Sequence, residues 1–235
     1  EATRERSIPQ HRRIAQGRCS RGPLIQLPPK TMTDEMPRTD DEIREKYLDR
    51  AIRELNSLAH EIHDCDECPR GHLMPVLGSG HPQADIFLLK HTAKPAEVEE
   101  GVAFYGRAGM ALQKSFKRLG IDPLTVYGTL SVKCPVEPVD AAESCTARVL
   151  DELMVVQPRI LVVMGENALD DVNALGMPGA AVLESRVGEL QSWTAHCEAL
   201  LTPDLDDCLD DEPYKREFWR AFKRLGDWHG DLPPY

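Results

Sequence analysis

The chain has 235 residues, of which 41% are hydrophobic and 29% charged, and its net charge is −11 at pH 7. This length and composition are typical of one substantial globular α/β domain with appendages, whose core needs no disulfides. The acidic balance argues against broad, nonspecific binding of nucleic acid by the whole surface. No apolar run approaches the about 18 residues of a membrane span, and the N-terminus has no apolar signal segment, so we expect a cytoplasmic protein.

Residues 1–38 differ in composition from the rest of the chain. They contain eight Lys or Arg residues against four acidic residues, about +4, which leaves about −15 for the remainder. They are rich in Pro, Arg and Ser and lack apolar periodicity, which favours a disordered tail. A basic tail on an acidic body also suits contact with nucleic acid or a partner. We predict a basic disordered tail over residues 1–38 and one folded domain over residues 39–235.

The folded part begins with a helix, because Thr39 and Glu42 match a capping box and apolar residues then recur at helical spacing up to Cys65. Further helices are predicted at 109–120, 141–157, 166–176 and 214–226. Short apolar runs predict buried strands at 85–89, 125–132 and 159–165, followed by a weaker pair at 182–187 and 198–202. Strands that alternate with helices predict a three-layer α/β/α sandwich around a mostly parallel central sheet.

The candidate site is expected just beyond the first of these strands, since ligands in such folds gather at the carboxyl ends of the strands. The segment KHTAKP begins at Lys90, directly after that strand. The segment GVAFYGRAG, residues 101–109, follows it with three glycines and one phenylalanine. The two segments together predict the wall of a pocket.

Four of the seven cysteines form two separated pairs, Cys65 with Cys68 and Cys134 with Cys145. Disulfides are unexpected in a cytoplasmic chain, whereas four thiolates from two pairs can surround one metal centre. The ten residues within the second pair suit a cubane cluster better than a zinc ribbon. Spacing alone leaves isolated structural thiols as the alternative. The other three cysteines lie outside the pattern: Cys19, Cys197 and Cys208.

The order of these motifs resembles the iron–sulfur, or family 4, uracil-DNA glycosylases. The CxxC pair is followed by an apolar strand, the loop GVAFYGRAG, a strand ending in KC, a later cysteine and the strand PRILVVMG, over about residues 45–228. The resemblance implies a uracil-DNA glycosylase-like fold, a role in DNA repair with DNA as a candidate partner, and a [4Fe–4S] cluster that braces the fold. The implied cluster ligands are Cys65, Cys68, Cys134 and Cys145.

The first catalytic motif of that family, G-E-x-P-G-x-x-E-D, aligns here without a gap but is largely replaced. Its opening glycine falls on Lys90 and its first glutamate on His91, and both of its glycines are lost. Its second glutamate is kept as Glu97, while the adjoining aspartate is Val98. The tight turn that brings the backbone close to a base therefore loses the residues that favour it.

The base pocket that the resemblance implies is also altered. Phe104 matches the aromatic residue that stacks on the base, although core packing is the alternative role for its ring. Leu130 replaces the asparagine that reads uracil, and leucine cannot hydrogen-bond a pyrimidine edge. Thr202 replaces the late histidine that stabilises the leaving base, and a hydroxyl is a weaker donor for that purpose.

Three functions are compatible with this pattern. The first is a protein with a degenerate active site that serves as a non-catalytic, DNA-associated or partner-binding subunit. The alternative is an active DNA glycosylase with altered base specificity, in which His91 acts as base or nucleophile and Glu97 assists. A redox or zinc protein unrelated to DNA is the third. The simplest expectation for Lys90, His91 and Glu97 is solvent exposure, because they stand in a loop and an acidic run.

Basic residues flank the aromatic loop and continue along the helix after it. They are candidates for phosphate contacts. Their spacing beside apolar residues is equally typical of the solvent face of a helix. These residues are Arg107, Lys114, Lys117 and Arg118.

Overall fold

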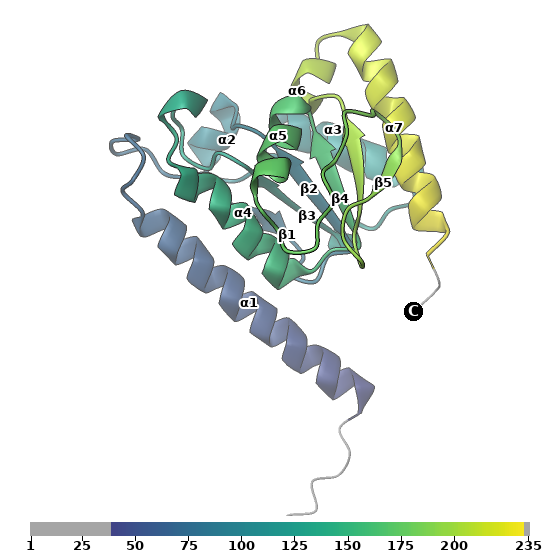
Figure 1. Ribbon diagram of the computed structural model, residues 1–235, viewed down its shortest axis with the longest axis horizontal. Helices are drawn as coiled ribbons and strands as arrows, with labels where there is room; N and C mark the ends of the chain where they lie inside the picture. Colours follow the sequence, from purple (N-terminus) through teal and green to yellow (C-terminus); the bar gives the residue numbers. More distant parts are fainter. Residues whose placement is uncertain (1–38, 233–235) are drawn as a thin grey trace, which may run out of the picture. The chain divides into compact units, whose positions relative to one another are not determined.

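The computed structural model describes residues 39–232 (Figure 1). The predicted tail of residues 1–38 lies outside the described residues, as do residues 233–235, so the division into tail and domain stays a prediction. A six-stranded sheet in the order β1-β3-β2-β4-β6-β5 forms the centre. Helices cover both of its faces, and the predicted α/β sandwich around a mostly parallel sheet is confirmed.

The four central strands are parallel, and the two edge strands are antiparallel to their neighbours. The central strands β2, β3 and β4 are buried along their whole length, as the continuous apolar runs predicted. The central strands are β2 (Ile86–Lys90), β3 (Val126–Leu130), β4 (Ile160–Met164) and β6 (Glu198–Thr202). The edge strands are β1 (Ser79–Gly80) and β5 (Leu190–Ser192).

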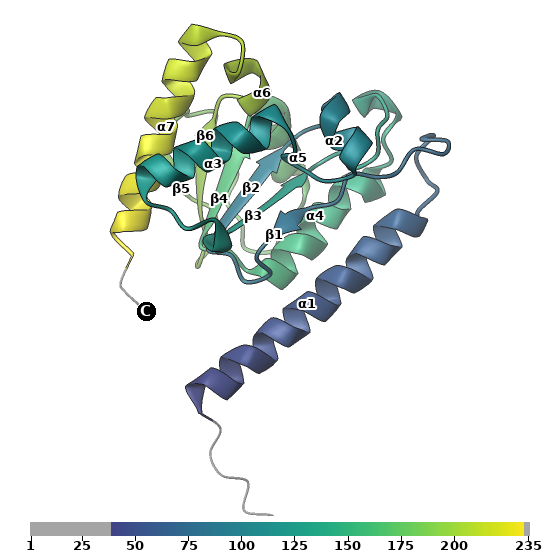
Figure 2. The same ribbon diagram turned by 180° about the vertical axis from the view of Figure 1, so that it is seen from behind.

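Alternate residues of the strands point to opposite faces of the sheet and belong to two separate hydrophobic cores. One core packs α4 (Glu143–Val156) and α5 (Glu166–Ala174) against the sheet, and α1 (Asp40–Asp64) contacts α4. The opposite core packs α3 (Arg107–Leu119), α6 (Leu205–Cys208) and α7 (Glu212–Gly230) against the other face. Figure 2 shows α3 and α7 together on that second face.

The helix ends follow local sequence signals. The capping box of Thr39 and Glu42 begins α1, as predicted. Gly120 ends α3 in the left-handed conformation that glycine favours, and Asp211 caps the first turn of α7. Between residues 39 and 232, no helix combines the length and apolar character needed to cross a membrane.

Two sequence predictions need correction. Residues 182–187 form no strand, because the side chain of Asn173 bonds both the amide and the carbonyl of Leu183 and holds this segment as a loop. The strand that pairs with β6 on the side away from β4 is β5 instead. Two short helices, α6 and α2 (Pro95–Glu100), were not predicted, and α2 lies within the motif segment that was interpreted as a loop.

Candidate functional site

Three of the predicted pocket positions are the last residues of parallel strands. Lys90 ends β2 and is in register with Leu130, the last residue of β3. On the other side, Lys90 is in register with Met164 of β4, which is in register with Thr202 of β6. These four residues therefore form a row along the carboxyl edge of the sheet, where the fold class predicts a ligand site.

Phe104 sits beside this row in a strained backbone conformation. Its φ is +58°, in the left-handed region that non-glycine residues rarely adopt. Its ring packs against the backbone of β3, since a Cβ at Gly128 would lie 2.6 Å from the ring, and a Cβ at Gly109 would clash with the Phe104 carbonyl. The two glycines thus make room for the phenylalanine, which stands half-buried where a stacking aromatic was predicted.

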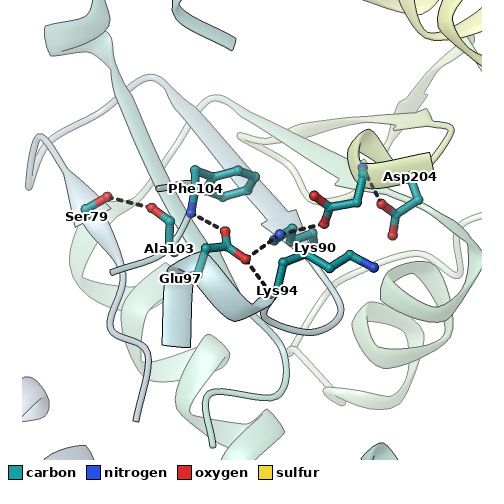
Figure 3. Close-up of polar contacts among 8 residues, drawn as sticks. Ser79, Lys90, Lys94, Glu97, Ala103, Phe104 and Asp204 are labelled. Atoms are coloured by element: carbon teal, nitrogen blue, oxygen red, sulfur yellow. Dashed lines mark hydrogen bonds and ion pairs between the residues drawn. The ribbon is translucent and has the colours of Figure 1, made fainter. Parts of the chain in front are cut away.

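Glu97 is buried, which corrects the expectation of a solvated carboxylate. The residue is only 1% exposed. Its carboxylate accepts hydrogen bonds from the backbone amide of Lys94 at 2.7 Å and from the backbone amide of Phe104 at 2.5 Å (Figure 3). The side chain therefore closes the turn at the start of α2 and holds the loop that carries Phe104.

Lys90 is also buried, with an exposed fraction of 0%. Its ammonium lies 2.7 Å from a carboxylate oxygen of Glu97 and 2.7 Å from one of Asp206. The expectation of a solvated lysine was wrong because Lys90 is the last residue of a buried strand and shares a face with Ile86 and Leu88.

The ammonium of Lys90 lies over the ring of Phe104, 5.6 Å from its centroid (Figure 3). Asp206 belongs to α6 and is fixed in turn by its backbone amide, which donates to Asp204 at 2.7 Å. Burial raises the pKa of Asp204. Lys90, Glu97 and Asp206 form one buried cluster, called here the lysine triad.

Leu130 and Thr202 offer no free polar group to the space beside the triad. Both are 0% exposed. Leu130 packs in an apolar cluster with Val76 and Ala103. The Thr202 hydroxyl lies 3.0 Å from the carbonyl of Pro203, to which it donates. A hydroxyl engaged in this way cannot also bind a developing negative charge.

His91 faces the other side of the sheet. Its Nδ1 lies 2.6 Å from a carboxylate oxygen of Asp171 on α5, whereas Glu97 bonds the lysine triad on the side of α6. The structure therefore gives His91 and Glu97 separate partners. The hydrogen bond to Asp171 raises the pKa of His91, against the lowering effect of burial.

Replacing Asp171 with asparagine is expected to lower the pKa of His91, because the largest cause of its elevation is removed. The stabilisation from a histidine with a raised pKa is complete below the unfolded value of about 6.5 and is lost as the pH rises through the folded value. A histidine NMR titration would measure the pKa, with Asp170→Asn on the exposed neighbour as control. An unchanged His91 titration in Asp171→Asn would contradict the pairing.

Three of the four predicted metal-ligating cysteines lie together. The sulfur atoms of Cys68, Cys134 and Cys145 are buried and lie within 4.8 Å of one another. Cys65, at the C-cap of α1, is half-buried and is not part of that group. Arg70 orders the loop between α1 and the group by donating to the carbonyls of His63, Cys65 and Leu73.

Backbone amides point at these sulfur atoms, as in a site for thiolates. The Lys133 amide lies 3.2 Å from Sγ of Cys145, and the Ala142 amide lies 3.3 Å from Sγ of Cys68. A hydrogen bond from the Cys134 thiol lowers the pKa of Cys145. Three close thiols with amide donors suit the sulfur ligands of an iron–sulfur cluster.

Sequence reasoning did not identify a second buried lysine beside the cysteines. The Lys133 ammonium lies 2.8 Å from a Glu152 carboxylate oxygen and 2.7 Å from the Thr129 hydroxyl. The Tyr127 hydroxyl also donates to Glu152, and burial raises the pKa of Tyr127. This network joins the loop of Cys134 to α4. The sequence did contain a sign of this polar network, because Tyr127 and Thr129 place two hydroxyl groups on one face of a predicted strand.

The surface around the lysine triad is mainly acidic. A cavity of about 630 Å³ next to Glu97 is lined by four aspartates and by two basic residues, Lys94 and Arg107. The guanidinium of Arg107 forms an ion pair with the carboxylate of Asp210 at 2.6 Å. The neighbouring cavity, of about 400 Å³, is lined by acidic side chains and by no Lys or Arg of the described chain. The aspartates of the first cavity are Asp206, Asp207, Asp210 and Asp211.

Comparison with known proteins shows which proteins the chain is similar to. Residues 77–223 match the family described as the uracil DNA glycosylase superfamily. The chain is also 26% identical over 121 residues to a type-4 uracil-DNA glycosylase of Pyrobaculum aerophilum. That alignment covers 48% of this chain and 61% of the relative. The resemblance inferred from the motifs is confirmed.

Proposed function

Since the chain belongs to the uracil DNA glycosylase superfamily, we propose that it is an iron–sulfur member that associates with nucleic acid or a partner protein without excising uracil. The observation that carries the proposal is the position of Lys90. Its ammonium lies 5.6 Å from the centroid of the Phe104 ring. A base stacked on that ring would need its own centroid at about 4.5–7 Å, so base and ammonium compete for the same space.

The lysine triad holds the Lys90 ammonium in its position over the Phe104 ring. Lys90 contributes a long side chain where the superfamily pattern has glycine, and two buried carboxylates hold its ammonium at 2.7 Å. Moving the lysine out would leave Glu97 and Asp206 buried without a counter-charge, which is strongly unfavourable. Leu130 adds an apolar wall in place of an amide that could read a base edge.

The charge of the surface beside the triad supports the same proposal. Asp206, Asp207, Asp210 and Asp211 line the cavity there and are called here the acidic rim. DNA binding depends on Lys and Arg side chains that neutralise phosphates. The rim beside the triad instead gathers aspartates, and the guanidinium of Arg107 is paired with one of them. Phosphates drawn to this rim would meet like charge, whereas a glycosylase must bind the backbone there to extrude a base.

The proposed cofactor is a [4Fe–4S] cluster held by Cys68, Cys134, Cys145 and, as the fourth ligand, Cys65. The three gathered sulfur atoms and their amide donors support it. When bound, such a cluster would brace the loops that carry its ligands. The Lys133–Glu152 ion pair anchors the loop of Cys134 to α4 independently of the cluster.

The alternative is an active glycosylase that works through His91 and Glu97. One observation favours it: the imidazole of His91 is oriented by a carboxylate at 2.6 Å, as in many general bases. Against it, Glu97 accepts hydrogen bonds from two backbone amides and from Lys90, and its residue is 1% exposed. The two side chains also have separate hydrogen-bond partners, Asp171 for His91 and Lys90 for Glu97.

Base release from oligonucleotides tests the proposal. Single- and double-stranded oligonucleotides carrying uracil, hypoxanthine or xanthine are incubated with metal-replete protein, and an active uracil-DNA glycosylase serves as positive control. We expect no release from any substrate. Release by the natural sequence that disappears in Glu97→Ala or His91→Ala would instead establish the alternative.

The same assay has a gain-of-function arm. The variant Lys90→Gly opens the space over Phe104, but we expect it to remain inactive because Leu130 still cannot read uracil. The combined variant Lys90→Gly, Leu130→Asn and Thr202→His restores three of the replaced groups, namely the space over Phe104, the amide that reads the base and the late histidine, and we expect uracil release above the no-enzyme background. A folded combined variant that binds no uracil-containing DNA would contradict the role assigned to Lys90.

A further inference from the structure

A groove of about 630 Å³ lies between α3 and α7, on the face of the sheet shown in Figure 2. Its floor includes Leu205, Cys208 and Phe218, which are buried. Its sides carry a single acidic residue, Glu212. They also carry five basic residues, Arg107, Lys114, Arg118, Lys215 and Arg216.

The two helices that form this groove are basic in an acidic chain. Together α3 and α7 contain nine Lys or Arg residues against three acidic residues, and α3 has no acidic residue at all. All nine basic residues are exposed. Since the whole chain carries −11, this concentration of positive charge stands out from the surrounding surface and favours a polyanionic ligand.

Several of the groove cations have no acidic partner within residues 39–232. Arg107 pairs with Asp210, and Lys215 lies 3.4 Å from Glu212. In the described chain, no carboxylate forms an ion pair with Lys114, Arg118 or Arg216. Their charges are therefore available to the phosphates of a ligand.

An aromatic ring lies among these cations. Trp219 is half-buried in the groove, and the guanidinium of Arg118 lies 4.7 Å from its ring centroid. Met110 adds an exposed apolar side chain at the same place. Proteins that bind single-stranded nucleic acid combine cations along the backbone path with aromatic or guanidinium planes on which bases stack.

We infer that the groove between α3 and α7 binds single-stranded nucleic acid, with Lys114, Arg118 and Arg216 contacting phosphates and the Trp219 ring stacking on a base. Unlike the buried Lys90, Arg118 is exposed and forms no ion pair with a carboxylate among residues 39–232, so it can turn from the Trp219 ring to a phosphate. The inference deepens the proposed function, since it names the nucleic-acid contact that a non-excising protein would use. The groove adjoins the acidic rim at Arg107 and Leu209, but Lys114 and Arg118 line only the groove. Changing these two residues therefore tests the groove without altering the pocket, so the failure of either proposal is visible without the other. Base release reports the pocket, and oligonucleotide affinity reports the groove.

The test measures binding of a fluorescein-labelled thymidine 20-mer to the full chain by anisotropy at several salt concentrations. Lys114→Glu with Arg118→Glu is expected to weaken binding at least about tenfold. It should also flatten the slope of log affinity against log salt by about 1.4, because each lost phosphate contact contributes about 0.7. The matched control, Lys46→Glu with Arg53→Glu, reverses two exposed charges on α1 and should bind like the natural sequence. Residues 1–38 are present in every variant, so the difference reports the groove.

Tryptophan fluorescence provides a second readout. Trp193 and Trp228 are buried, so the half-buried Trp219 should account for any quenching by the 20-mer. We expect quenching in the natural sequence and none in Trp219→Phe. Equal weakening in the α1 control, equal affinity for the corresponding duplex, or competition by polyglutamate at equal charge would overturn the inference, the last in favour of an acidic protein partner.

Discussion

Replacing Lys90 with methionine is expected to destabilise the protein by about 3–5 kcal/mol, the range for removing one partner of a buried ion pair. The effect should be this large because Lys90 is the single cation of the lysine triad and faces two carboxylates at 2.7 Å each. Its loss leaves Glu97 and Asp206 buried as like charges. Denaturant unfolding followed by circular dichroism would measure the change in free energy.

Two comparisons make this prediction specific. The exposed neighbour Lys94 is a matched control, and Lys94→Met should change stability by less than about 0.5 kcal/mol. Adding Glu97→Gln and Asp206→Asn to Lys90→Met should recover part of the loss, because no buried charge then remains without a partner. Equal effects of Lys90→Met and Lys94→Met would show that the triad is not a buried charge cluster in solution.

Cys134→Ser and Cys145→Ser are each expected to abolish metal binding in anaerobically purified protein. The natural sequence should contain four iron and four labile sulfide per chain, with the visible absorbance of an iron–sulfur cluster. Each of these two thiols is one of three buried sulfur atoms within 4.8 Å. One zinc per chain without sulfide would contradict the proposed cluster and support a structural zinc site.

Two further variants, Cys65→Ser and Cys197→Ser, test the fourth ligand and provide a control. Cys65→Ser decides the fourth ligand, since Cys65 lies outside the group formed by the other three cysteines. We expect iron loss comparable to that of Cys134→Ser. Cys197 is buried and also lies outside the group, so Cys197→Ser should retain the full iron content. Retention of iron by Cys65→Ser would remove Cys65 from the ligand set.

The sequence predicted the central fold because its strands carry strong local signals. The strands β2, β3 and β4 are mostly apolar in sequence and buried over their whole length, which is typical of parallel strands covered on both faces. The edge strands were harder to predict. A two-residue strand such as β1 has no periodicity of its own, and β5 depends on pairing with β6 rather than on an apolar pattern.

The sequence indicated where the site residues lie, but it did not indicate how deeply they are buried or which side chains they contact. Lys90, Phe104, Leu130 and Thr202 were placed at the pocket by matching the family's motifs, and the register brings the three strand ends into one row. The partner Asp206 could not be foreseen, since it lies 116 residues from Lys90 in the sequence. The burial of Glu97 was missed because α2 is a single short helix within a polar segment.

The gathering of Cys68 with Cys145 has a consequence for the unfolded chain. These residues are 77 positions apart, and the chain between them includes β2, α3 and β3. A metal bound by both would close this stretch into a loop even after the sheet has melted, in the way that a disulfide does. Cross-links over loops of 15 to 100 residues remove chain entropy worth about 3–4.7 kcal/mol. Metal retention during unfolding would therefore make refolding a search within a closed loop rather than along an open chain.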